Sequence, residues 1–169
     1  MVGLALAAAP APTCRTADHR VESVIAAKVR QAGGTEYCQS RLYHTVDDLD
    51  GDGRDDFVLV FEVEAAGGGN DSVQYLVVFP SSAGWRPSVV QVGERGERFV
   101  DEIDVEDGPT LVLLTSEYVA GDPMCCPSGE GELRYRLVRG RVVPVPDEPT
   151  QKKITRSSSG MHGVDRPGR

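Results

Sequence analysis

The sequence lacks the short motifs that mark most catalytic sites. It contains no G-x-S-x-G nucleophile elbow, no H-E-x-x-H zinc motif, no phosphate-binding loop and no G-x-G-x-x-G after a strand pattern. Histidine is scarce: His162 lies near the C-terminus, His19 begins a helical pattern, and His44 has no identifiable nucleophile beside it. The sequence therefore predicts no catalytic residue.

Long apolar runs and an excess of positive charge are also missing. No segment approaches the roughly 20 consecutive apolar residues that a transmembrane helix needs. The 18 lysines and arginines are outnumbered by 26 acidic residues, which gives a net charge of −8 at pH 7. Such a chain repels nucleic-acid backbones unless its basic residues gather on one face, and the sequence shows no basic cluster in its folded part. We expect no transmembrane segment and no nucleic-acid partner.

The composition that remains is typical of one globular, β-rich domain. A chain of 169 residues is long enough for one domain with a core and too short for two domains with a linker. Its 40% hydrophobic and 26% charged residues indicate a folded rather than a disordered chain. Its 19 glycines and 11 prolines imply many turns between short elements, which favours strands.

The first residues resemble the end of a secretory signal peptide. The stretch MVGLALAAAPAPTC combines a short apolar run with small residues of the A-x-A type, although it lacks a positively charged beginning. We predict that residues 1–13 are a remnant of a signal peptide or, alternatively, a flexible leader. The protein is accordingly expected to be exported to the periplasm or the extracellular space. A lipoprotein anchor on Cys14 is a weaker interpretation, because the preceding residues APT make a poor lipobox.

Hydrophobic periodicity divides the rest of the chain into one helix and several strands. After Asp18, a candidate N-cap, apolar residues recur at helical spacing until Gly33 and Gly34. The period then changes to two, with turns between the runs. We predict an α+β domain over residues 14–146, in which one N-terminal helix packs on a mainly antiparallel, β-rich sheet of about six to eight strands. Residues 147–169 are basic and aperiodic, and they are predicted to be a disordered tail.

The stretch DDLDGDGRDDFVLVFEVE, residues 47–64, places six aspartates within ten positions at the entry of a strand pattern. Counted from Asp48 as position 1, carboxylates fall at positions 1, 3, 5 and 9, with glycine at position 6. This spacing suits a hard cation such as Ca²⁺, because the glycine allows the sharp turn by which successive oxygens converge. An EF-hand would need a glutamate at position 12, where this chain has Leu59. The candidate ligands are the side chains of Asp48, Asp50, Asp52 and Asp56 and the backbone carbonyl of Arg54.

The segment DLDGDGRDDFVLV resembles the calcium loop of FG-GAP and VCBS-type repeats, in which a D-x-[DN]-G-D-G-x-x-D loop opens an apolar strand. The resemblance implies the same ligands and a structural role for the ion. It covers one loop only, whereas a propeller built from such repeats needs several. The alternative is a polar turn without an ion, because aspartate and glycine are good turn formers. Repulsion among so many carboxylates argues against that alternative.

Four cysteines in an exported chain indicate disulfides, for which three connectivities are possible. A bond between Cys14 and Cys38 would close a loop of about 24 residues and fasten the helix to the sheet. Cys125 and Cys126 are adjacent, and a bond between them would form a stiff, exposed ring. We interpret this ring as a structural staple of its loop or, alternatively, as a redox switch.

The segment GDPMCCPSGEGELRYRLVRGRVV resembles secreted bacterial proteins of unknown function, in which a DP-x-CCP loop joins two strands. Together with the D-x-D-G-D-G loop upstream, the likeness covers residues 41–146, and it implies no established activity. Prolines and glycines exclude regular structure here, while methionine and cysteine leave apolar surface at the tip. We therefore predict a contact loop made of Asp122, Pro123, Met124, Cys125, Cys126 and Pro127.

These features favour a non-catalytic exported module, binding or structural, with a calcium-stabilised loop. Its expected partner is an envelope or extracellular protein or glycan, and the chain is expected to be a monomer. One alternative is a thiol–disulfide enzyme or redox switch at Cys125 and Cys126. Another is an inhibitor of a cell-envelope hydrolase that acts through the contact loop.

Overall fold

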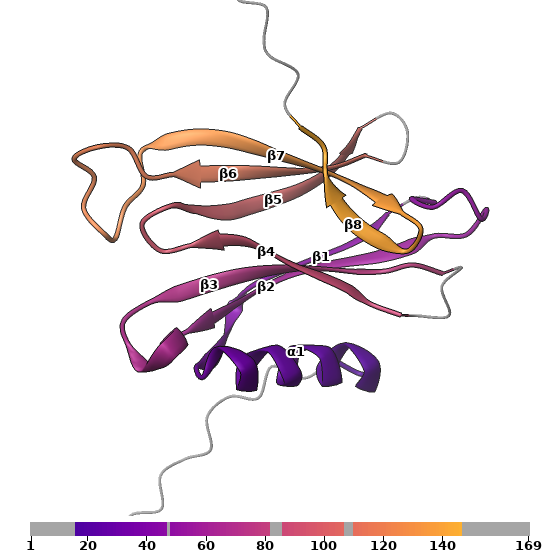
Figure 1. Ribbon diagram of the computed structural model, residues 1–169, viewed down its shortest axis with the longest axis horizontal. Coiled ribbons are helices and arrows are strands. Elements are labelled where there is room, and N and C mark those ends of the chain that lie inside the picture. Colours follow the sequence, from indigo (N-terminus) through magenta and orange to yellow (C-terminus); the bar gives the residue numbers. More distant parts are fainter. Residues whose placement is uncertain (1–15, 47, 82–85, 107–109, 147–169) are drawn as a thin grey trace, which may run out of the picture.

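The computed structural model describes residues 16–46, 48–81, 86–106 and 110–146 (Figure 1). The predicted leader over residues 1–13, Cys14 and the predicted tail over residues 147–169 lie outside these ranges. Within them, no helix combines the length and the apolar character that crossing a bilayer requires.

Helix α1, His19–Ala32, begins and ends at the signals that the sequence contains. The Asp18 side chain accepts a hydrogen bond from the Arg20 backbone N–H at 2.8 Å, as an N-cap does. Gly33 closes the helix in the left-handed conformation, with φ of 70°, which glycine adopts without strain. A Cβ on Gly34 would lie 2.2 Å from the Glu64 carbonyl oxygen, so the second glycine lets the chain pass close to the sheet.

In the described part of the chain, eight strands follow the helix and form one antiparallel meander in which each strand pairs with the next. A short 3₁₀ turn, Ala66–Gly68, lies between the second and third strands. The strands are β1 Thr35–Val46, β2 Asp56–Glu64, β3 Ser72–Phe79, β4 Ser88–Glu94, β5 Arg98–Glu106, β6 Thr110–Glu117, β7 Gly129–Val138 and β8 Arg141–Pro144. This architecture confirms the predicted α+β fold with one helix on a β-rich sheet.

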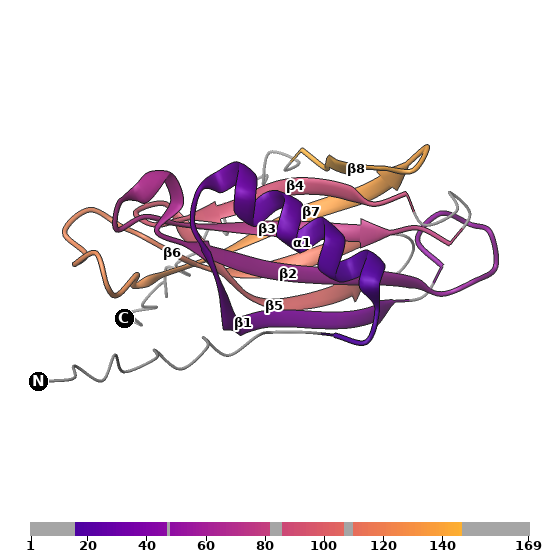
Figure 2. The same cartoon turned by 90° about the horizontal axis from the view of Figure 1, so that it is seen from below.

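The sheet folds over on itself where its pairing is weakest. β4 and β5 share the single residue pair Glu94 and Arg98, whereas the other neighbouring strands pair over longer stretches. The half made of β5 to β8 therefore stacks over the half made of β1 to β4, and α1 covers the far side of the first half. Figures 1 and 2 show the resulting three layers.

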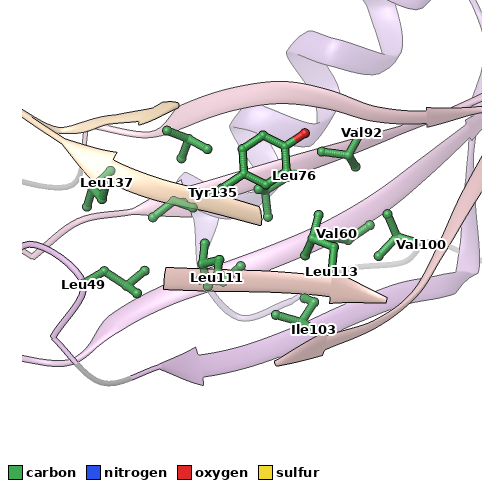
Figure 3. Packing of buried hydrophobic residues seen from close by; sticks show 13 residues of the cluster. Leu49, Val60, Leu76, Val92, Val100, Ile103, Leu111, Leu113, Tyr135 and Leu137 are labelled. Atoms are coloured by element: carbon green, nitrogen blue, oxygen red, sulfur yellow. The ribbon is translucent and has the colours of Figure 1, made fainter. Parts of the chain in front are cut away.

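Two hydrophobic cores separate these layers. The inner core, between the two halves of the sheet, is shown in Figure 3. Its buried residues are Leu49, Val58, Val60, Leu76, Val78, Val92, Val100, Ile103, Leu111, Leu113, Tyr135, Leu137 and Val142. The outer core, between α1 and the sheet, consists of Val21, Ile25, Leu59, Phe61, Val63, Val77 and Phe79. β2 and β3 contribute to both cores, which explains why their sequences are nearly continuous apolar runs.

A buried ion-pair network fastens α1 to β1. The Arg41 guanidinium on β1 donates to Glu36 at 2.8 Å and to Glu22, in the first turn of the helix, at 3.1 Å. It also donates to the Tyr43 hydroxyl at 2.8 Å. The Arg41 side chain is only 4% exposed, so these partners offset the free-energy cost of burying its charge. The sequence pattern gave no indication of this network.

Candidate metal centre and contact loop

The aspartate loop, residues 48–55, connects β1 to β2 at one end of the molecule (Figures 1 and 2). Gly51 and Gly53 have φ of 83° and 82°, a left-handed conformation that most side chains disfavour. Glycine lets the chain adopt this conformation at both positions without strain. The Leu49 side chain is 2% exposed and packs into the inner core. Figure 3 shows it at the edge of the cluster.

Three carboxylates converge where this loop enters β2. One oxygen atom from each of Asp48, Asp50 and Asp56 lies within 4.8 Å of the others. Oxygens bound to Ca²⁺ lie about 2.3–2.6 Å from the ion, so two ligands of one ion can be at most about 5 Å apart. The oxygen donors and their spacing therefore fit a calcium ion.

The fourth predicted carboxylate is placed differently. Asp52 is not part of the converging group; one of its oxygens accepts from the Arg54 backbone N–H at 2.9 Å and from the Ser81 hydroxyl at 2.8 Å. Its side chain thus links the aspartate loop to the segment that follows β3. The Arg54 carbonyl stays a predicted ligand.

Backbone N–H groups hold Asp48 in place. Its carboxylate accepts from Gly51 at 2.6 Å, from Asp52 at 2.8 Å and from Gly53 at 2.6 Å. These bonds, that of Gly53 foremost, hold the pKa of Asp48 below its ordinary value and keep it ionised. A polar turn without an ion would make the same bonds, so they do not by themselves indicate a metal.

Asp56 is the most informative member of the group. It is 1% exposed, and its two oxygens accept from the backbone N–H groups of Leu49 at 2.9 Å and Ser81 at 2.7 Å. Burial raises the pKa of Asp56, the bonds from Ser81 and Leu49 oppose this shift, and the charge of Asp50 adds to it. The net shift is upward, so the two backbone bonds offset burial and repulsion only in part, and a bound cation would offset the remainder.

Comparison of the chain with protein-family models, with curated proteins and with solved structures found no match. The likeness of the aspartate loop to FG-GAP and VCBS-type calcium loops therefore stays a hypothesis based on its residues and on their geometry.

The contact loop lies between β6 and β7, at the opposite end of the molecule from the aspartate loop (Figures 1 and 2). Asp122 organises it: one carboxylate oxygen accepts from the backbone N–H groups of Val119 and Ser128, each at 2.9 Å, and the other accepts from the Ser128 hydroxyl at 2.8 Å. The Tyr118 hydroxyl donates to the Met124 carbonyl at 2.7 Å. The loop is therefore ordered, while the Met124 side chain is 55% exposed at its tip.

Cys125 and Cys126 are bonded to each other, and both are exposed. Cys38 is also disulfide-bonded. Cys14, a candidate partner of Cys38, lies outside the described residues. Sequence reasoning did not identify Asp122 as the residue that organises the contact loop, although an aspartate followed by proline is a common signal for a turn.

Replacing both Cys125 and Cys126 by serine is expected to change the melting temperature by less than about 2 °C, because a ring of two adjacent residues hardly restricts the unfolded chain. The bonds to Asp122 would still close the loop. Replacing Cys14 and Cys38 together provides the matched control, with an expected loss of about 3 kcal/mol for a loop of that length. Failure of the Cys125→Ser, Cys126→Ser variant to fold would contradict the staple interpretation.

Proposed function

We propose that the protein is a non-catalytic exported module, binding or structural, whose aspartate loop binds a calcium ion that stabilises the fold. The observation that carries the proposal is the convergence of Asp48, Asp50 and Asp56 on one point, with Asp56 buried. Burial of a carboxylate beside two others costs free energy unless a positive charge is present.

The position of the loop accounts for a stabilising role. Asp48 lies just after the end of β1, and Asp56 is the first residue of β2. An ion bound to both would therefore hold the two ends of the loop together. Asp56 also accepts a hydrogen bond from the backbone N–H of Ser81, which lies in the segment after β3. The ion would supply positive charge, and these residues would place the oxygens around it. Because it would bind only the native loop, it would stabilise the fold by mass action.

Export is supported by the chemistry of the cysteines. Disulfides persist in oxidising compartments and are rare in reducing ones. The pair Cys125 and Cys126 and the bonded state of Cys38 agree with an extracytoplasmic location, as does the apolar leader with its small residues.

Thiol–disulfide exchange is the second candidate function, because the bond between Cys125 and Cys126 is exposed and therefore accessible to a thiolate. An insulin-reduction assay separates the two functions: a non-catalytic module gives the rate of the buffer alone. The alternative of a hydrolase inhibitor is supported only by the ordered, exposed contact loop.

Calcium is expected to raise the melting temperature relative to EDTA. At a concentration about 100 times its dissociation constant, an ion adds about 2.7 kcal/mol to the stability of the native state. For a domain of this size, that corresponds to roughly 5–15 °C. Differential scanning fluorimetry or calorimetry measures the shift directly.

Two variants from the same loop make this experiment specific. Asp50→Asn removes a converging carboxylate and should lose most of the shift. Asp55→Asn removes the same charge from an exposed neighbour outside the group and should keep it. Equal shifts in both variants would indicate general screening of acidic charge instead of a site.

A further inference from the structure

A polar pocket lies where β8 crosses the beginning of β4, and it shares no residue with the aspartate loop. It has a volume of about 680 Å³. One wall is the chain around Arg86 and Ser88, and the other is the β7–β8 turn with Arg139 and Arg141. The Val142 backbone N–H donates to the Ser88 hydroxyl at 2.9 Å and joins the two walls. We call it the arginine pocket.

The arginine pocket is positive in a protein whose net charge is −8. Arg86, Arg139 and Arg141 line it, and no carboxylate of the described part of the chain does. Among the described residues, no ion pair or hydrogen bond involves the guanidinium group of any of these three arginines. Arg41 and Arg134, by contrast, each pair with two glutamates. Three unpaired guanidinium groups around one pocket repel one another, and an anion between them would remove that repulsion.

The backbone at Arg139 supports a role beyond folding. The β7–β8 hairpin turns through Arg139 and Gly140, with φ of 52° and 71°. A two-residue turn with both φ values positive favours asparagine, aspartate or glycine at its first position. Arginine there costs conformational free energy, and residues held in such conformations cluster at binding sites. Here the unfavourable residue is one that lines the pocket.

We propose that the arginine pocket binds a multiply charged oxyanion, namely a phosphoryl group. Each guanidinium is planar and donates paired hydrogen bonds that match phosphate oxygens. A single carboxylate would satisfy one arginine, whereas phosphate or pyrophosphate offers enough oxygens and charge for three. The volume lies within the range of small-ligand sites, about 300–1,000 Å³. This site is independent of the calcium proposal, because it uses different residues and a ligand of opposite charge.

Titration with inorganic pyrophosphate in calcium-free, low-salt buffer tests the proposal by calorimetry. Wild-type protein should bind pyrophosphate. Arg86→Ala and Arg141→Ala should each raise the dissociation constant at least tenfold. Arg30→Ala removes an exposed arginine from the last turn of α1, outside the pocket, and should change it less than twofold. A second arm uses vesicles of phosphatidylglycerol or of phosphatidylcholine. Arginine-dependent binding to phosphatidylglycerol vesicles alone would identify a lipid headgroup as the source of the phosphoryl group.

Arg139→Asn separates ligand binding from folding. It converts the turn to Asn-Gly, so the melting temperature should rise, while pyrophosphate affinity should fall at least fivefold. Absence of binding to both pyrophosphate and phosphatidylglycerol vesicles would overturn the proposal. So would binding that the Arg86, Arg139 and Arg141 variants leave unchanged, or that Arg30→Ala weakens equally.

Discussion

Replacing Arg41 by alanine should destabilise the protein by about 3–5 kcal/mol, the usual effect of removing one partner from a buried ion pair. The guanidinium is 4% exposed and pairs with Glu22 and Glu36, whose side chains are 24% and 14% exposed. Without it, two carboxylates would stay in the gap between α1 and β1 with no counter-charge. Urea denaturation monitored by circular dichroism measures the loss of unfolding free energy.

Arg20→Ala is the control, because Arg20 lies on the same helix but its ion pair with Asp18 is exposed. Such surface pairs contribute about 1 kcal/mol or less. If Arg41→Ala and Arg20→Ala cost the same, the network does not fasten the helix.

The same network should give stability a pH dependence through Glu22. Burial opposes its ionisation, but the Thr16 backbone N–H and the Arg41 guanidinium outweigh this and hold the pKa of Glu22 below its ordinary value. A lowered pKa stabilises the native state above the unfolded pKa of about 4.3, and this contribution disappears as pH falls through the folded pKa. The difference in unfolding free energy between wild type and Glu22→Gln should therefore be largest near neutral pH. It should disappear as the pH falls below about 4.

Replacing Leu49 by alanine should cost about 2–5 kcal/mol, because it leaves a cavity in the inner core. Leu49 is 2% exposed, and it belongs to the aspartate loop as well as to the core (Figure 3). Its backbone N–H also donates to Asp56 at 2.9 Å. The variant should therefore bind calcium more weakly as well as unfold more easily, which denaturation with and without the ion would show.

Leu114→Ala is the matched control for this change, since Leu114 is the same residue type but 39% exposed. It should cost about 1 kcal/mol or less and leave calcium binding unchanged. A Leu49→Ala variant as stable as Leu114→Ala would mean that the loop is not anchored in the core.

Helix α1 and the strands could be predicted because their signals are local. Asp18 and Gly33 mark the ends of α1 within the sequence itself, and the apolar runs of β2 and β3 reflect burial on both faces. The aspartate spacing likewise predicted a loop in which carboxylates come together.

Features that depend on distant segments could not be predicted. The sheet folds at the single pair between β4 and β5, which no local pattern indicates. In the sequence, Leu49 resembles an ordinary loop residue. In the fold it packs in the inner core, to which the second half of the sheet contributes. Ser81 is 25 residues from Asp56 in the chain, yet it bonds to that carboxylate.

The arginine pocket is also formed by residues that are distant in the sequence. Its arginines lie at positions 86, 139 and 141, so the sequence contains no basic run that joins them. The sequence therefore predicted no basic cluster in the folded part, whereas the approach of β8 to β4 creates a small one.

The most direct test of the proposed calcium site is an isothermal titration of the metal-free protein with Ca²⁺. Wild-type protein and Asp55→Asn should bind one ion per chain with the same affinity. Asp50→Asn should bind at least tenfold more weakly, because it loses a charged oxygen ligand from the group around Asp56. No saturable binding by the wild-type protein, or equal binding by Asp50→Asn, would contradict a calcium site in the aspartate loop.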